Sequence, residues 1–272
     1  MPELPEVETI LRGLIPHLEQ HLIQEVRIRN SQLRWPIPSD LSLNLNNQRI
    51  LHLSRRGKYL LIQVSTGTLI IHLGMSGSLR MVNDTTALRL HDHFDLVFSN
   101  HTLLRYNDPR RFGAILWTTA DPLFHPLLKT IGLEPFDSQF DGRYLQQQSL
   151  RRNTNIKSFI MNSKIVAGIG NIYAAEILFL SHLHPNKAVS LLTQAQWDHL
   201  GIIIPQVLQS AIHKGGTTLK DYVNSEGKPG YFSQDLYVYG RGGLLCKVCQ
   251  HPLDTLKLNQ RSTVFCAHCQ LE

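Results

Sequence analysis

The sequence comprises 272 residues and 31.0 kDa, enough for one large domain or two of ordinary size. Hydrophobic residues make up 42% of it and charged residues 18%, which excludes a disordered chain. A mean hydropathy of -0.13, without any long apolar run, excludes a membrane-spanning helix.

The net charge of +6 is distributed unevenly. Residues 151–272 carry 12 Lys and Arg against 7 Asp and Glu, whereas residues 1–150 carry 15 against 14. A basic C-terminal half indicates a polyanionic partner, and nucleic acid fits better than a membrane because no basic amphipathic helix stands out. A basic surface that is merely solvated is the alternative that charge alone leaves open.

The N-terminal half begins with a helical pattern and continues with β-type patterns. The start, MPELPEVE, is acidic, unlike the basic first region of a signal peptide, so we expect a soluble, cytoplasmic protein. Apolar residues from Val7 to Leu18 recur at helical spacing and predict an amphipathic helix. Short apolar runs separated by turn signals then predict a β-sandwich or barrel, so that residues 1–130 form a helix plus antiparallel sandwich. Examples of these predicted strands are 26–28, 49–53, 59–64, 69–73, 94–98 and 103–106.

Residues beyond 120 change in character. The segment 121–150 is rich in Pro, Asp and Gln, which predicts a linker, placed between the domains at 131–150. Helices are expected at 172–183 and 194–213, with Asn171 and Thr193 as their N-caps. Residues 215–230 have few apolar anchors and predict a long mobile loop. The fold class expected from these patterns is α+β.

All four cysteines lie near the C-terminus, in the spacing C-x2-C-x16-C-x2-C. They are Cys246, Cys249, Cys266 and Cys269. Two thiolate pairs at this spacing predict a tetrahedral zinc site, and disulfides are disfavoured in a reducing cytosol. Because four protein ligands leave no open coordination position, one structural Zn²⁺ is expected and the chemistry must lie elsewhere.

The N-terminus offers a candidate nucleophile. Removal of the initiator Met would leave Pro2 as a secondary amine, and an α-amine has far more free base at neutral pH than a lysine has. Such an amine can attack a sugar C1′ to give an iminium, with the neighbouring Glu3 as general acid or base. The structural alternative is ordinary, since Pro and acidic residues are common in the first turn of a helix.

Four further positions have the residue types of a DNA interface. Lys58 lies in a basic turn, and NDPRRFG at 107–113 combines arginines with Phe112, an aromatic able to enter a base step. Gly168 and Gly170 precede a capped helix, whose N-terminus attracts phosphate, although no strand precedes them as a dinucleotide fold requires. Arg261 lies between the cysteine pairs, where a zinc hairpin would present it to phosphate. Solvated charges and a core Phe are the structural alternatives.

Together these motifs resemble the formamidopyrimidine-DNA glycosylase family, the base-excision enzymes for 8-oxoguanine and ring-opened purines. The resemblance covers nearly the whole chain and is specific because the motifs occur in order. They are MPELPEVET at the start, RRGKYL at 55–60, HLGMSG at 72–77, HDH at 91–93, NDPRRFG at 107–113, GIGNIYAAE at 168–176, and the cysteine hairpin with NQRSTVFC.

The resemblance implies a role for each matched position. Pro2 would form the Schiff base with Glu3 as acid/base, while Lys58 would assist β-elimination and Arg261 δ-elimination. Three side chains would fill the space of the flipped nucleotide, with Arg110 reading the opposing cytosine. The implied DNA contacts are Met75, Arg110 and Phe112 in that space, and His72, His91, Arg152, Lys157 and Asn171 elsewhere.

The resemblance also implies the domain plan and the partner. After the sandwich and linker, residues 151–240 would hold a helix–two-turns–helix element at 156–177 and a lesion-capping loop near 217–228, and residues 241–272 a zinc-finger hairpin. The partner would be double-stranded DNA with oxidised purines opposite cytosine, bound by a monomer associated with the nucleoid. The alternatives are an endonuclease VIII-like glycosylase for oxidised pyrimidines, a zinc-ribbon DNA-binding regulator without catalysis, and a housekeeping protein with a chance zinc ribbon.

Overall fold

A computed structural model describes residues 1–216 and 236–271 of the chain. They divide into two compact units, Met1–Thr130 with Lys214–Tyr231, and Ile131–His213 with Phe232–Glu272. The predicted lesion-capping loop at 217–228 lies outside the described residues. Within the described part of the chain, no helix is both long and apolar enough to cross a bilayer.

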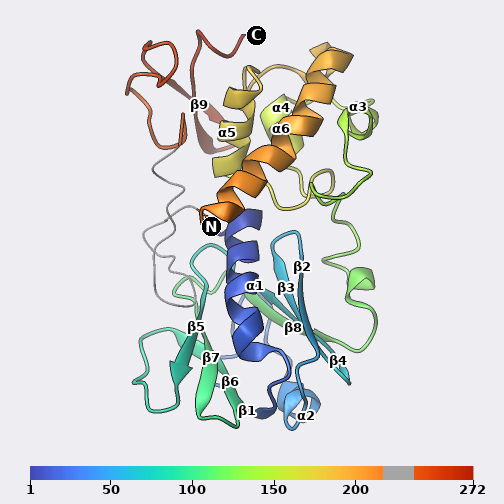
Figure 1. Cartoon of the computed structure of the whole chain (residues 1–272), viewed down its shortest axis with the longest axis vertical. Helices are drawn as coiled ribbons and strands as arrows, with labels where there is room; N and C mark the ends of the chain where they lie inside the picture. Colours follow the sequence, from blue (N-terminus) through green and yellow to red (C-terminus); the bar gives the residue numbers. More distant parts are fainter. Residues whose placement is uncertain (217–235, 272) are drawn as a thin grey trace. The chain divides into compact units, whose positions relative to one another are not determined.

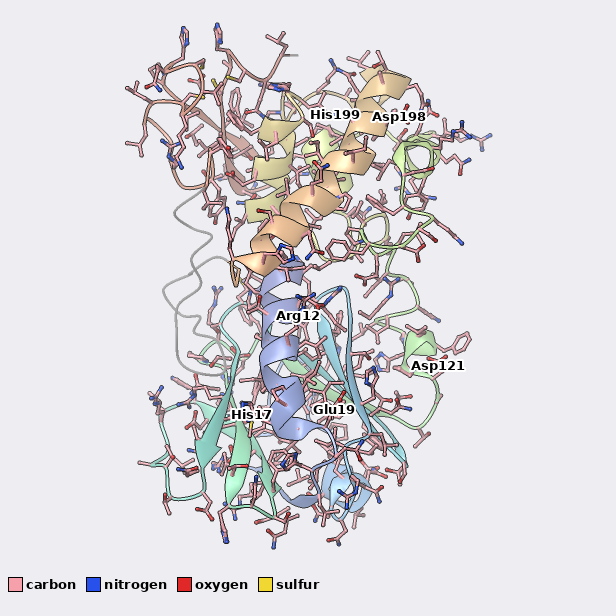
Figure 2. All side chains as sticks on the ribbon, in the orientation of Figure 1. Arg12, His17, Glu19, Asp121, Asp198 and His199 are labelled. Carbon is pink, nitrogen blue, oxygen red and sulfur yellow. The ribbon has the colours of Figure 1, made fainter. Side chains whose placement is uncertain are left out.

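Helix α1, Leu4–Leu18, opens the first unit as its apolar periodicity predicts. One face, including Val7, Ile10 and Leu14, is fully or almost fully buried. The helix packs against strands of two different sheets, β2 and β3 in one and β5 in the other, and runs between them in the view of Figure 1. Its C-terminal end is held by Glu19, which accepts from the Leu53 N–H at 2.9 Å; Figure 2 labels Glu19 there.

Two four-stranded antiparallel sheets form the rest of the first unit, which confirms the predicted sandwich. Their strand orders are β1-β6-β7-β5 and β2-β3-β4-β8, and their inward faces share one hydrophobic core with α1. A short helix, α2, lies against β1. The elements are β1 Ile23–Ile28, α2 Leu41–Leu45, β2 His52–Arg56, β3 Tyr59–Val64, β4 Gly67–His72, β5 Ser78–Asn83, β6 Asp92–Phe98, β7 Thr102–Asn107, β8 Ala114–Thr118 and the 3-10 turn η1 Pro122–Phe124.

Two of the four edge strands of these sheets, β5 and β8, were not among the runs named from the sequence. β5 and β8 each end a sheet, and only Leu79 of β5 is buried, so the edge strand has no apolar run that would reveal it. The strand predicted at 49–53 begins at His52, because Ile50 exchanges backbone hydrogen bonds with Gln20 (2.8 Å) and His21 (3.0 Å) after α1. The pattern found the central strands and parts of the edge strands β1 and β2, but not the edge strands β5 and β8.

The second unit is helical and carries a C-terminal β-hairpin. The predicted helix at 194–213 is confirmed as α6, whose start is capped by Thr193 Oγ1 accepting from the Gln196 N–H at 3.3 Å. α5 ends at Leu180, not at residue 183. The elements are α3 Gly142–Ser149, α4 Ile156–Ile160, α5 Asn171–Leu180, η2 Val189–Leu191, α6 Gln194–His213, β9 Asp254–Leu258 and β10 Arg261–Phe265.

Part of the segment predicted as a linker, 131–150, is helix α3, packed against α6. Asp141 caps it by accepting from the Tyr144 N–H at 2.7 Å. The two backbones approach so closely that a Cβ on Gly142 would lie 2.5 Å from the backbone of Asp198, which Figure 2 labels on α6. The helix is therefore held by backbone contact and a cap, which a polar composition does not reveal.

Candidate active site and nucleic-acid interface

The predicted nucleophile lies at the N-terminal end of α1. Pro2 is buried, and Glu3, 2% exposed, is the N-cap of the helix. The Glu3 N–H donates to Glu6 Oε2 at 2.8 Å, and the Val7 N–H donates to the Glu3 carbonyl at 3.1 Å. Both ends of this turn are thus fixed, so Pro2, the residue before it, has a defined position.

The end of the described first unit lies against the same turn. Gly216 has φ +79°, and a Cβ there would lie 3.1 Å from Glu6 Oε1 and 3.5 Å from the Glu6 Cα. Only a glycine accepts this combination of close approach and left-handed backbone without strain. Gly216, the last described residue before residue 217, therefore lies beside the N-terminal turn of α1.

Lys58 and His72 are neighbours on the second sheet. Lys58 follows Gly57 in the turn between β2 and β3, and register pairs Tyr59 with His72. The His72 ring lies 4.6 Å from the Tyr59 ring, and its Nδ1 accepts from the Gly74 N–H at 3.0 Å. Burial, aided by the positive charge of Lys58, lowers the pKa of His72 to about 4. His72 is therefore a neutral imidazole whose Nε2–H is the donor.

This neutral state predicts a pH-dependent stability. Between pH 6.5 and about 4 the unfolded chain binds a proton at His72 that the folded chain does not, so the unfolding free energy falls as pH falls through this window. His72→Gln should remove about 2–3 kcal/mol of that fall, at 1.36 kcal/mol per pKa unit. Urea unfolding at pH 7 and 4.5 measures it, with His17→Gln, an exposed histidine on α1 (Figure 2), as the control. Equal pH dependence in wild type and His72→Gln would contradict the neutral assignment.

Met75, Arg110 and Phe112 come together on two adjoining turns of the first unit. Met75 is 43% and Phe112 45% exposed, and the Arg110 guanidinium lies 4.7 Å above the Phe112 ring. The turn that carries Met75 touches the other directly, since a Cβ on Gly74 would lie 2.4 Å from the Phe112 carbonyl carbon. Exposed apolar and cationic side chains held this way are suited to entering a base stack.

His91 lies close to the same turns. It has φ 72°, and its ring is 6.0 Å from that of His93. The His91 carbonyl accepts from the Asp108 N–H at 3.1 Å. Asp108 itself is fully buried and bonded to both turns; it lies within the motif NDPRRFG but sequence reasoning gave it no role.

A second cluster, in the helical unit, contains Lys157, Asn171 and Thr263. Lys157 is 2% exposed, and its Nζ donates to Asn171 Oδ1 at 2.7 Å and to Thr263 Oγ1 at 2.6 Å. The Asn171 amide donates to the Ser262 carbonyl at 3.2 Å. The predicted cap role of Asn171 is wrong, because the N-cap of α5 is Gly170 and the Asn171 side chain binds the hairpin instead.

The cluster borders a small cavity of about 200 Å³ at the start of the hairpin strand β10. Arg261 is the first residue of β10 and is exposed. The residues that line the cavity are Lys157, Ser158, Met161, Leu258, Asn259 and Arg261. Arg152 lies elsewhere, before α4, where its Nε donates to the Gln148 carbonyl at 2.6 Å. Cationic and amide side chains from α4, α5 and β10 thus converge, as an anion-binding surface requires.

Glu176 is a buried residue of α5 that the sequence reasoning missed. Its carboxylate accepts from three consecutive backbone N–H groups, those of Tyr237 (2.8 Å), Val238 (3.0 Å) and Tyr239 (2.8 Å). These bonds tie α5 to the segment leading into the cysteine hairpin. An acidic residue in an otherwise apolar helix, NIYAAEILFL, was the available signal.

The four cysteines fit a zinc ion. All four Sγ atoms lie within 4.8 Å of one another, with Cys246 to Cys269 at 3.9 Å and Cys249 to Cys266 at 3.4 Å. These separations are too long for disulfides and close to the edges of a tetrahedron with Zn–S bonds of about 2.3 Å. The set holds one structural Zn²⁺ at the base of the hairpin that carries Arg261.

Comparisons with known proteins decide the family. Residues 1–115 match the formamidopyrimidine-DNA glycosylase N-terminal domain, residues 131–223 the H2TH domain of the same glycosylase, and residues 243–271 the zinc finger found in FPG and IleRS. The chain belongs to the formamidopyrimidine-DNA glycosylase family. The formamidopyrimidine-DNA glycosylase of Saccharophagus degradans is 52% identical over 270 residues, which cover 99% of this chain and 100% of the relative.

Solved structures of this family have the same fold. Lactococcus lactis Fpg in complex with DNA containing an abasic site has a TM-score of 0.92 at 32% identity, over 99% of this chain and 100% of that one. Thermus thermophilus MutM (Fpg) has a TM-score of 0.89 at 33% identity, over 99% and 98%. The chain is therefore a DNA repair glycosylase with a helix–two-turns–helix domain and a zinc finger, as its motifs predict.

Proposed function

We propose that this formamidopyrimidine-DNA glycosylase family member removes 8-oxoguanine and formamidopyrimidines from duplex DNA through a Schiff base on Pro2, and then cleaves the strand. The observation that carries the proposal is the buried Pro2-Glu3 pair fixed at the N-terminal end of α1. A solved relative, wild-type Lactococcus lactis Fpg (MutM), was bound to DNA containing N7-benzyl-Fapy-dG. We extend this substrate class to the present chain.

The first chemical step joins Pro2 to the sugar. The free Pro2 nitrogen attacks C1′ and loses its proton, while the bond from C1′ to the base nitrogen breaks and the base leaves with the bonding pair and takes up a proton. The C1′–O4′ bond then breaks, O4′ takes up a proton, and the nitrogen lone pair forms the double bond to C1′. The product is an iminium, which is positively charged without carrying a proton on nitrogen. The positive end of the α1 dipole disfavours a cation beside it and so favours the uncharged amine that attacks. Glu3, at the same end, is placed to exchange the proton.

Strand cleavage follows from the electron-poor iminium. Loss of a C2′ proton expels the 3′ phosphate (β-elimination), and loss of a C4′ proton then expels the 5′ phosphate (δ-elimination). We assign assistance of the first to Lys58, in the β2–β3 turn, and of the second to Arg261, at the start of β10. Zinc supplies no chemistry and fixes the hairpin that carries Arg261.

The DNA must be opened before Pro2 can reach C1′. Flipping a nucleotide costs a few kcal/mol, and side chains that enter the gap recover part of it. Met75, Arg110 and Phe112 are exposed together and fit this task, with Arg110 donating to the opposing cytosine. Phosphates would be held by the neutral His72, by His91, by Arg152 and by the Lys157–Asn171 cluster.

A substrate panel tests this function. Single-turnover excision should be fastest for formamidopyrimidine and 8-oxoguanine opposite cytosine, and about tenfold or more slower opposite adenine, since a good bidentate contact discriminates by about 1–3 kcal/mol. Thymine glycol should be a poor substrate; preferred excision of it would instead support the endonuclease VIII-like alternative. Tight binding without excision of any lesion would support the non-catalytic regulator. Sedimentation with and without DNA measures the oligomeric state, which we expect to be a monomer. Affinity for DNA would place this monomer on the nucleoid.

A further inference from the structure

Asp108 is a completely buried carboxylate, at the end of β7, that has no part in the chemistry proposed above. Its Oδ1 accepts from the Ser76 hydroxyl at 2.7 Å, and its Oδ2 accepts from the Gly113 N–H at 2.9 Å and the Tyr106 hydroxyl at 3.1 Å. One side chain therefore binds the turn 74–77, strand β7 through Tyr106, and the C-terminal end of the loop 107–113. Hydrogen bonds to an ionised carboxylate are about twice as strong as neutral ones.

The three donors lie at different points of the two turns: Ser76 in the turn 74–77, Tyr106 just before the loop 107–113, and Gly113 at the end of that loop. Burial, and the negative charge of Asp108, raise the pKa of Tyr106 far above its ordinary value, so its hydroxyl remains a donor. A Cβ on Gly113 would lie 1.9 Å from that hydroxyl, so the loop closes on Tyr106 only with glycine there. The Asp108 carbonyl also accepts from His93 Nε2 at 2.9 Å.

Ser76 connects the carboxylate to Arg110. Its hydroxyl donates to Asp108 and accepts from the Arg110 N–H at 3.2 Å. Through this one oxygen, the turn with Met75 and the loop with Arg110 and Phe112 are held at a fixed separation. The side chains themselves remain exposed, with the guanidinium above the Phe112 ring.

We propose that Asp108 is a positioning residue that fixes Met75, Arg110 and Phe112 as one preorganised element, and that it thereby sets selectivity for the opposing base. The inference rests on the proposed function, in which these three side chains enter the gap left by the flipped nucleotide. Ordering side chains during binding costs affinity, and a misplaced donor loses its base contact. A buried carboxylate that orders both turns beforehand avoids these losses.

The test compares Asp108→Asn and Ser76→Ala with Ser76→Thr, which keeps the hydroxyl. A matched control is Asp95→Asn, because Asp95 is equally buried in the same sandwich but binds Arg29 and Arg105, away from the two turns. Single-turnover excision of 8-oxoguanine opposite cytosine and opposite adenine is measured, together with the unfolding midpoint. We expect Asp108→Asn and Ser76→Ala to lose about tenfold of the preference for cytosine, the value of one bidentate base contact. Ser76→Thr should keep the wild-type preference for cytosine. Asp95→Asn should lower the unfolding midpoint without changing that preference.

An unchanged cytosine preference in Ser76→Ala and in folded Asp108→Asn would overturn the inference, whatever their stability. Equal loss of preference in Asp95→Asn would also overturn it, because general destabilisation would then explain the effect. Arg110→Ala separates this inference from the function on which it rests. Lost preference in Arg110→Ala alone overturns only the role of Asp108, whereas no loss in Arg110→Ala overturns the proposed reading of cytosine as well.

Discussion

Pro2→Gly should lower both strand cleavage and borohydride trapping by about a hundredfold or more, the scale of a positioned catalytic group, while DNA binding falls only modestly. The glycine amine is primary, so its imine must be protonated before it withdraws electrons, whereas the proline iminium is charged at once. Glycine also has more backbone freedom than proline, so the attacking nitrogen at position 2 is held less firmly before the turn fixed by Glu3 and Glu6. Cleavage of abasic-site DNA under single turnover measures the chemistry, and affinity for a tetrahydrofuran abasic analogue measures binding.

The chain offers a matched control in Pro5, a second buried proline in the first turn of α1. Pro5→Ala keeps the terminal amine and places a good helix former in the helix, so its cleavage rate should stay within a few-fold of wild type. Wild-type cleavage by Pro2→Gly would contradict the assignment of the nucleophile. An equally slow Pro5→Ala would mean that helix integrity, and not the amine, accounts for the loss.

Cys246→Ser should lose zinc and weaken binding to abasic-analogue DNA by about 10- to 100-fold at moderate salt. Cys246 is fully buried, and structural zinc sites supply much of the folding free energy of such small elements. Without the ion, β10 no longer holds Thr263 against Lys157 or presents Arg261, so two cations lose their fixed positions. The slope of log affinity against log salt should therefore decrease by about one to two.

Val248→Ser is the control for the hairpin, because Val248 lies between two of the cysteines and is 63% exposed. It should retain one zinc per chain, wild-type affinity and the wild-type salt slope. Metal analysis and fluorescence anisotropy are measured on the same preparations. A zinc-free Cys246→Ser protein with undiminished affinity would show that the ion does not support the DNA interface.

The sequence predicted best those elements whose pattern reflects a buried face or a coordination geometry. β3 and α6 have the predicted bounds, because β3 is almost wholly apolar and α6 keeps one apolar stripe after a capping threonine. The four cysteines are close together, as expected for a spacing that lets two thiolate pairs share one ion. Edge strand β5 and polar helix α3 were missed, since their stability comes from pairing and backbone contact that leave little hydrophobic signal.

The residues of the candidate site also fall into those that the sequence identified and those that it missed. The family resemblance named Lys157, Asn171 and Arg261, and in the structure Lys157 binds Asn171 and lines one cavity with Arg261 in the helical unit. Asn171 was nevertheless assigned the wrong bond, because an amide before a helix is as well suited to capping as to a tertiary contact. Asp108 and Glu176 were missed, since the role of a buried carboxylate depends on donors far away in sequence, such as Ser76 or Tyr237.

The assignment of Pro2 is tested most directly by borohydride reduction of the wild-type enzyme on an 8-oxoguanine duplex, followed by proteolysis and mass spectrometry of the N-terminal peptide. We predict an adduct on a peptide that begins at Pro2, with the mass of the deoxyribose remnant on the proline nitrogen. An adduct on Lys58 or another lysine, or full activity in protein whose Met1 is retained or whose terminus is acetylated, would contradict it.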